Sequence, residues 1–171
     1  MDIENKRLNI YDLVILPFLG ALLFVVQIVF AGLPNVELVS FLIIIYTLYL
    51  GKKTFYSIYI FVILEIVYWG FNTWSISYLY IWSILALIVL ILKRKNSIWL
   101  WSFVSAFFGL AFGALCALTI LFIGGVSAAA AYWVSGIYFD IVHCVFNFAL
   151  CLIFYTPVNH LFKVVFRKRR D

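Results

Sequence analysis

The sequence predicts an all-α integral membrane protein, a bundle of six transmembrane helices with both termini in the cytoplasm. Three observations lead to this fold class: an extreme apolar composition, a series of long apolar runs, and basic residues confined to one side of them. Of the 171 residues, 67% are hydrophobic and 11% are charged, and the mean hydropathy is +1.16. Ordinary soluble domains are about 45–50% apolar and about 25% charged. The composition therefore argues against a soluble enzyme, a nucleic-acid-binding module and a disordered chain.

Six apolar runs follow one another, and a bilayer-spanning helix takes about 20 such residues. Because backbone groups in lipid must be hydrogen-bonded internally, we expect each run to be a helix. Each run is bounded by glycine, proline, lysine or polar residues, so the chain forms one membrane domain over residues 13–157, between an N-terminal segment (1–12) and a basic tail (158–171). The predicted spans are, in order, residues 13–31 (ending at GLPN), 36–50 (ending at GKK), 55–71 (ending at NTWS), 78–92 (ending at KRKN), 98–123 (ending at GG) and 137–155, preceded by a short segment at 127–134.

The basic residues set the orientation. All twelve fall before the first span or after the second, fourth and sixth, which places them on one side of the predicted bundle. The positive-inside rule makes that side the cytoplasm. The opposite side carries no Lys or Arg. These residues are Lys6, Arg7, Lys52, Lys53, Lys93, Arg94, Lys95, Lys163, Arg167, Lys168, Arg169 and Arg170.

Polar side chains recur inside the spans, at similar depth toward the outer side. Glu65 shares one helical stripe with Trp69 and Asn72, and Asp140 begins a second stripe on the last span. Ionisable residues within a span are costly and usually face a bundle interior or a wet cavity. We expect them to line a pocket open to the outside, the alternative being hydrogen bonds between packed helices. The candidate ligand-binding residues are Glu37, Glu65, Trp69, Asn72, Trp133, Asp140, His143 and Asn147.

The sequence gives little indication of a metal site, a proton relay or nucleophilic catalysis. Asp140 and His143 could share a metal ion or relay protons with Glu65, but no second cluster of ligands lies at that depth. The three cysteines form no CxxC pair, and no nucleophile has a recognisable motif around it. We therefore expect no catalytic residue, no resident metal, no cofactor, no enzyme activity and no nucleic-acid partner.

Two further features suggest packing and lipid contacts. Ser105, Gly109, Gly113 and Ala117 recur at four-residue spacing, which permits close approach of helices; packing inside the bundle is favoured over a docking surface. The tail at 162–170 mixes apolar and basic residues, which indicates binding to anionic headgroups.

Three segments together resemble a known family. Residues 132–143 (YWVSGIYFDIVH), with Asn147 and Pro157, resemble the last helix of the substrate-binding S components of energy-coupling factor (ECF) transporters. Residues 32–39 (GLPNVELV) resemble their first loop and second helix, and residues 74–82 fit the same pattern. The length, the six spans and the cytoplasmic termini match over essentially the whole chain.

This resemblance implies a vitamin- or metal-binding subunit of a multi-pass prokaryotic plasma-membrane importer. Such subunits bind substrate from outside beneath the loop after helix one, then dock on a membrane coupling protein driven by two ATPase subunits. Gly32, Leu33, Pro34 and Asn35 would form that gating loop, with Gly32 supplying conformational freedom. The family often docks through an Ala-xxx-Ala pattern on helix one, where this chain has Pro17-xxx-Ala21; Gly20 and Ala21 become the docking candidates.

The ligand class follows from charge. Glu37, Glu65 and Asp140 lie in the outer half without any Lys or Arg, so a multiply anionic ligand would lack a partner. A cationic or amine-bearing planar heteroaromatic fits better, such as a vitamin B6 form or a thiamine-related pyrimidine, because tryptophan can hold it by cation–π contact. Two alternatives remain: a membrane scaffold of the rod-shape determining type, and a stand-alone carrier coupled to protons or cations.

Overall fold

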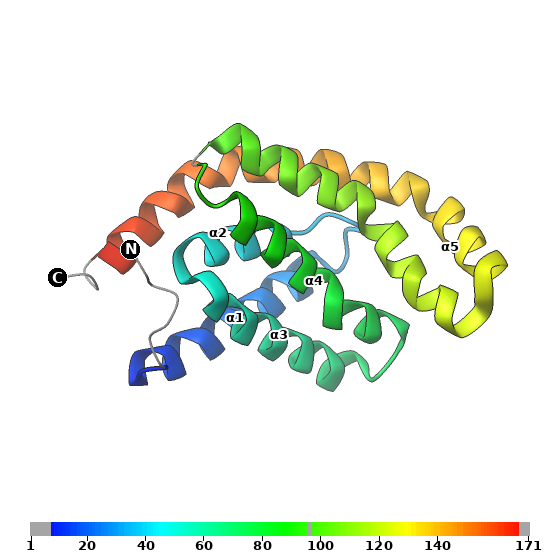
Figure 1. Cartoon of the computed structure of the whole chain (residues 1–171), viewed down its shortest axis with the longest axis horizontal. Helices are drawn as coiled ribbons and strands as arrows, with labels where there is room; N and C mark the ends of the chain where they lie inside the picture. The colour runs from blue at the N-terminus through cyan, green and yellow to red at the C-terminus, as the bar shows by residue number, and fades with distance from the viewer. Residues whose placement is uncertain (1–7, 96, 168–171) are drawn as a thin grey trace.

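The computed structural model describes residues 8–95 and 97–167, and this part of the chain is helical with no strand (Figure 1). The last helix, α5, contains one non-helical residue, Gly125, with φ 80° and ψ −178°. There the chain doubles back, so a first arm (98–124) and a second arm (126–167) lie side by side. The elements are α1 (Ile10–Phe30), α2 (Val39–Leu50), the 3₁₀ turn η1 (Gly51–Lys53), α3 (Thr54–Trp69), α4 (Thr73–Leu92) and α5 (Ile98–Arg167).

Local sequence explains where the helices begin and end. Asn9 caps α1 in a reciprocal arrangement with Asp12, and Asn72 caps α4 in the same way, which satisfies backbone N–H groups of the first turn. Gly51 follows α2 with φ 59°, and Gly70 follows α3 with φ 80°. Only glycine adopts these left-handed angles without strain, so it stops the helix there.

The described helices confirm the all-α class, but not every predicted span. Three helices, α1, α4 and α5, are long and apolar enough to cross a membrane. By contrast, α2 has 12 residues and α3 has 16, fewer than the about 20 that a span requires. The second run starts at Val39 rather than at residue 36. The segment 127–134, predicted to precede the last span as a separate piece, belongs to the second arm of α5, which continues to Arg167.

The shortest α-helix, α2, lies at the centre of the molecule. It contacts α1, α3, α4 and α5, and its residues Val39, Ile43, Ile44, Ile45 and Tyr46 are fully buried. A helix that is apolar on all sides is stable only when other helices surround it. The other helices therefore form a shell around α2, and they keep their own apolar outer faces exposed.

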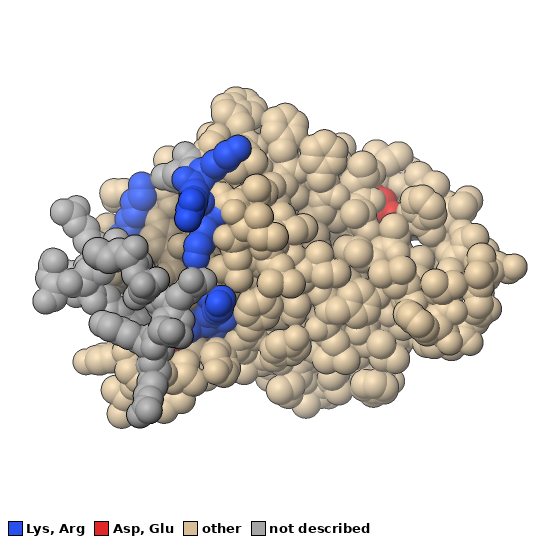
Figure 2. All heavy atoms as spheres, viewed as in Figure 1, with Lys and Arg blue, Asp and Glu red and all other residues tan. Residues whose placement is uncertain are grey.

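Charge is segregated along the long axis. Figure 2 shows Lys and Arg gathered at the end of the molecule where α1 begins and α5 ends in Figure 1. At this end Lys53 pairs with the buried Asp12 at 2.6 Å, which joins the start of α1 to η1. Five of the basic residues used for the orientation lie outside the described residues: Lys6, Arg7, Lys168, Arg169 and Arg170.

Candidate functional site

A cavity of about 720 Å³ lies at the far end of α1 from the basic cluster. Its walls come from the end of α1, the loop 31–38, α3, the start of α4 and both arms of α5. Ligand pockets in proteins measure about 300–1,000 Å³. The cavity thus has the size of a small-molecule site, and it lies among the outer polar residues singled out in the sequence.

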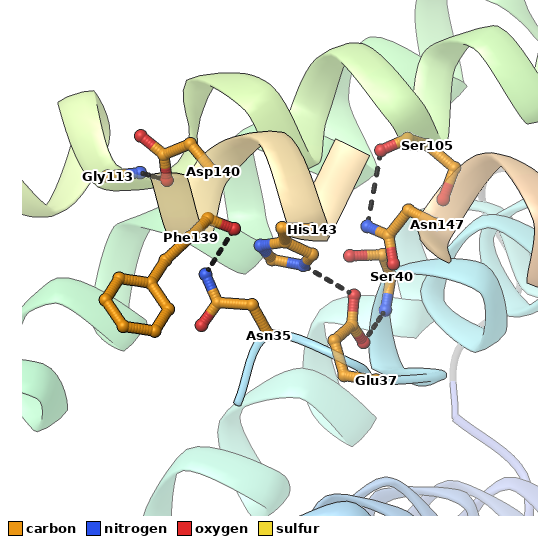
Figure 3. A network of polar contacts seen from close by, with 9 residues as sticks. All are labelled: Asn35, Glu37, Ser40, Ser105, Gly113, Phe139, Asp140, His143 and Asn147. Carbon is orange, nitrogen blue, oxygen red and sulfur yellow. Dashed lines mark hydrogen bonds and ion pairs between the residues drawn. The ribbon is translucent and has the colours of Figure 1, made fainter. Parts of the chain in front are cut away.

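The loop 31–38 is tied to the second arm of α5 by two polar contacts (Figure 3). Oε1 of Glu37 lies 3.0 Å from Nε2 of His143, and Oε2 of Glu37 accepts a hydrogen bond from the backbone N–H of Ser40 at 2.8 Å. Nδ2 of Asn35 donates to the carbonyl oxygen of Phe139 at 2.9 Å. These contacts hold the loop over one side of the cavity.

In the predicted gating loop, the left-handed backbone angle is found at Asn35. Asn35 has φ 59°, a left-handed angle that Asn tolerates better than other non-glycine residues. Gly32, expected to supply conformational freedom, does not adopt a positive φ in this structure. Asn35 combines the turn and the hydrogen bond to Phe139 in one side chain.

The stripe of small residues on the first arm is internal packing, as predicted. The backbone N–H of Gly113 donates to Oδ1 of Asp140 at 2.9 Å. A Cβ atom on Gly113 would overlap the Asp140 carboxylate, and one on Gly109 would lie 2.9 Å from the carbonyl carbon of His143. The absence of side chains at these glycines lets the two arms approach and sets Asp140 and His143 in the cavity wall.

Five polar atoms in the cavity wall lack any hydrogen-bond partner among the described residues. Buried polar atoms are nearly always paired, and each unpaired one costs free energy. All five residues line the same cavity, so a ligand there could satisfy them together. The atoms are Oε1 of Gln27, Oε1 of Glu65, Nε1 of Trp82, Oδ2 of Asp140 and Nδ1 of His143.

Aromatic side chains complete the walls. Trp69 is 56% exposed and borders the cavity, while Trp82 is buried beneath it. Phe112 packs its ring edge-on against His143, with centroids 5.0 Å apart. None of the described residues that line the cavity is Lys or Arg. The site therefore offers hydrogen-bond acceptors and aromatic surface, with the imidazole of His143 as its basic group.

Some candidate residues do not face the cavity, and these expectations need correction. Nδ2 of Asn147 donates to the carbonyl oxygen of Ser105 at 3.3 Å, away from the cavity lining, so it joins the two arms of α5. Trp133 lies on the second arm and does not line the cavity. Asn72 borders the cavity, but its side chain is used to cap α4 and to donate to Gly70.

The docking candidates differ from each other. Gly20 is buried, and a Cβ atom there would lie 2.7 Å from the carbonyl oxygen of Ser57, so its surface is already used for packing against α3. Ala21 is partly exposed. Gly20 was thus wrongly expected on a free surface, because small residues serve internal and external helix contacts equally.

Several lining residues were not among the candidates predicted from the sequence. Phe112 and Cys116 carry no polar signal that distinguishes them from other apolar residues of the first arm. Tyr78 and Tyr132 were not singled out, although a hydroxyl on an apolar helix could have marked them. The lining residues missed include Tyr78, Trp82, Phe112, Cys116 and Tyr132.

In the parts of the chain that the structure describes, no three His, Cys, Asp or Glu side chains gather in a way that could hold an ion.

Comparison with family models, with curated proteins and with solved structures gave no match.

Proposed function

We propose that this chain is the substrate-capture subunit of an ECF-type importer in a prokaryotic plasma membrane. It would bind a small water-soluble vitamin or precursor from outside and deliver it inward with a coupling subunit and two ATPase subunits. In this proposal α1 to α4 and the two arms of α5 each cross the bilayer, with the basic end in the cytoplasm. Because α2 is too short to cross by itself, the loop 31–38 before it and η1 after it would complete that crossing.

The single observation that carries the proposal is the convergence of unpaired polar atoms on one cavity. Residues of α1, α3, α4 and α5 each contribute a buried atom without a partner among the described residues; they are Gln27, Glu65, Trp82, Asp140 and His143. A membrane scaffold gains nothing from such atoms, since each destabilises the fold. A binding protein uses them, because the ligand supplies the missing hydrogen bonds.

The chemistry of these atoms favours a ligand rich in donors. Three of the five are acceptors, and two of those belong to carboxyl groups; Nε1 of Trp82 is a donor. A planar ring that bears an amine or a positive charge can donate to them while it lies against Trp69, by cation–π contact worth up to about 2 kcal/mol. Vitamin B6 amines and thiamine have this chemistry, whereas biotin and pantothenate are anions.

Thermal unfolding of the purified protein in detergent tests the proposal. Thiamine or pyridoxamine at 100 times its dissociation constant should stabilise the protein by about 2.7 kcal/mol, and biotin should not. Mass spectrometry of the denatured protein should detect a small molecule that copurifies. Trp69→Ala should weaken the stabilisation, while Trp133→Ala, on the same end of the molecule but outside the cavity lining, should retain it. No stabilisation and no copurifying molecule would leave the scaffold as the better interpretation.

Docking on the coupling subunit is tested separately. Ala21 is the remaining candidate on α1, so Ala21→Trp should reduce copurification of the coupling subunit while ligand binding persists. Loss of both together would instead indicate that Ala21 packs inside the fold.

A further inference from the structure

The three carboxyl groups in the cavity differ in how they are compensated. Glu37 has His143 at 3.0 Å and the Ser40 N–H at 2.8 Å. Asp140 receives one hydrogen bond, from the Gly113 N–H. Glu65 is only 7% exposed, and its Oε1 has no partner among the described residues. Glu65 is therefore the least compensated of the three carboxyl groups.

Glu65 is also surrounded by groups that cannot supply a positive charge. It comes from α3, and the cavity that it lines contains further acidic or weakly acidic side chains from the loop 31–38, α4 and α5. A carboxylate buried without a cation is unstable, and it either binds a proton or pairs with a positive group. The basic side chain of His143 is directed to Glu37. The titratable groups that share the cavity are Glu37 from the loop, Tyr78 from α4, and Cys116, Tyr132, Asp140 and His143 from α5.

We propose that Glu65 exchanges a proton for the positive charge of the ligand. Without ligand, Glu65 is a neutral carboxylic acid. When the ligand enters, the carboxyl group releases its proton to solvent on the outer side, and the resulting carboxylate pairs with the ammonium or ring cation. One proton leaves for each cation bound, so the net charge of the cavity is unchanged. This inference rests on the proposed function.

The exchange makes Glu65 the residue that selects for charge. A neutral ring of the same shape would leave Glu65 protonated and would gain only hydrogen bonds from it. For a permanently charged ligand such as thiamine, affinity should rise with pH while Glu65 is protonated, since releasing one proton becomes easier. One oxygen of Asp140 already accepts a hydrogen bond from Gly113. Asp140 would therefore orient the ligand, and its own carboxyl group would keep the same protonation state.

Two measurements on the purified full-length protein test this. Infrared spectra at neutral pH, taken without added ligand, should contain a protonated carboxyl band in the wild type and in Asp140→Asn that disappears in Glu65→Gln. Calorimetry with thiamine in phosphate and in Tris should report release of about one proton in the wild type and in Asp140→Asn. Glu65→Gln should bind thiamine at least about 30-fold more weakly, because one partner of a buried charge pair is lost, and should release no proton.

Several outcomes would overturn the inference. Thiamine binding without proton release, or with a release that is lost in Asp140→Asn but kept in Glu65→Gln, would overturn the exchange at Glu65 and leave the proposed capture function standing. Failure of thiamine and pyridoxamine to bind would overturn the exchange together with the proposed ligand class. Thermal unfolding of each variant separates these results from a folding defect, because Glu65→Gln keeps the shape of the side chain.

Discussion

Nε2 of His143 lies 3.0 Å from Oε1 of Glu37, although the two residues are 106 positions apart in the sequence. Both side chains are buried, at 3% and 9% exposure. The contact connects the loop after α1 to the second arm of α5, at the edge of the cavity. It therefore links closure of the loop to the position of a residue in the cavity wall.

Breaking this contact should destabilise the closed loop. Removal of one partner from a buried pair leaves the other unsatisfied, at a cost of about 3–5 kcal/mol where both are charged. We expect Glu37→Gln and His143→Gln each to lower the apparent unfolding temperature in detergent. The double variant should be less damaged than the sum of the two, with a coupling of about 1 kcal/mol or more.

A control for this cycle comes from the other end of the molecule. Tyr49 donates a hydrogen bond to the backbone oxygen of Asn159 at 3.0 Å, away from the cavity. Tyr49→Phe should therefore add to His143→Gln without coupling. Strict additivity of Glu37→Gln with His143→Gln would show that the two residues do not stabilise each other.

The stability of the loop 31–38 should depend on both the side chain and the backbone angle of Asn35. Asn35→Ala loses the hydrogen bond to Phe139 and places a Cβ at φ 59°. Asn35→Gly loses only the hydrogen bond, so it should be more stable than Asn35→Ala by about 1 kcal/mol. Both should increase protease cleavage in the loop 31–38 relative to the wild type. Equal stability of the two variants would mean that the left-handed angle is not maintained in solution.

The glycines of α5 should not tolerate substitution equally. A Cβ on Gly109 would lie 2.9 Å from the His143 carbonyl carbon, whereas one on Gly136 meets no atom within 4 Å. Gly109→Ala should cost about 1–3 kcal/mol, because the two arms must separate. Gly136→Ala, also helical, should be neutral or slightly stabilising, since alanine favours the helix. Thermal unfolding compares them, and a harmless Gly109→Ala would contradict the close packing of the arms.

Much of the fold could be predicted because hydropathy and glycine breaks are local signals. The runs at 13–31 and 78–92 correspond to α1 and α4, and the basic breaks fall at one end of the molecule. The breaks at Gly51 and Gly125 were predicted, and both glycines take a left-handed angle. The break at Gly70 was missed, because hydropathy counts apolar residues whether or not they are helical and carried the predicted third span on to residue 71.

The cavity was predicted in outline and missed in detail. Glu37, Glu65, Asp140 and His143 stand out because charge inside an apolar run is rare, and all four line the cavity. Asn147 has the same helical spacing as His143, yet the packing of the two arms turns it to the Ser105 carbonyl. Spacing along one helix shows which residues share a face; the neighbour that covers the face decides which of them reach a cavity.

The proposed six crossings give a sharp prediction for the orientation of the chain in the membrane. After replacement of Cys116, Cys144 and Cys151, single cysteines can be placed at exposed positions at both ends. Leu33 and Trp74 are 56% and 63% exposed and lie at the cavity end, whereas Lys95 follows α4 at the basic end. A maleimide that cannot cross membranes should label Leu33→Cys and Trp74→Cys in intact cells. It should label Lys95→Cys only after the membrane is permeabilised, because positive residues stay on the cytoplasmic side. Labelling of Lys95→Cys in intact cells would reverse the orientation and place the opening of the cavity toward the cytoplasm, which would exclude capture of a ligand from outside.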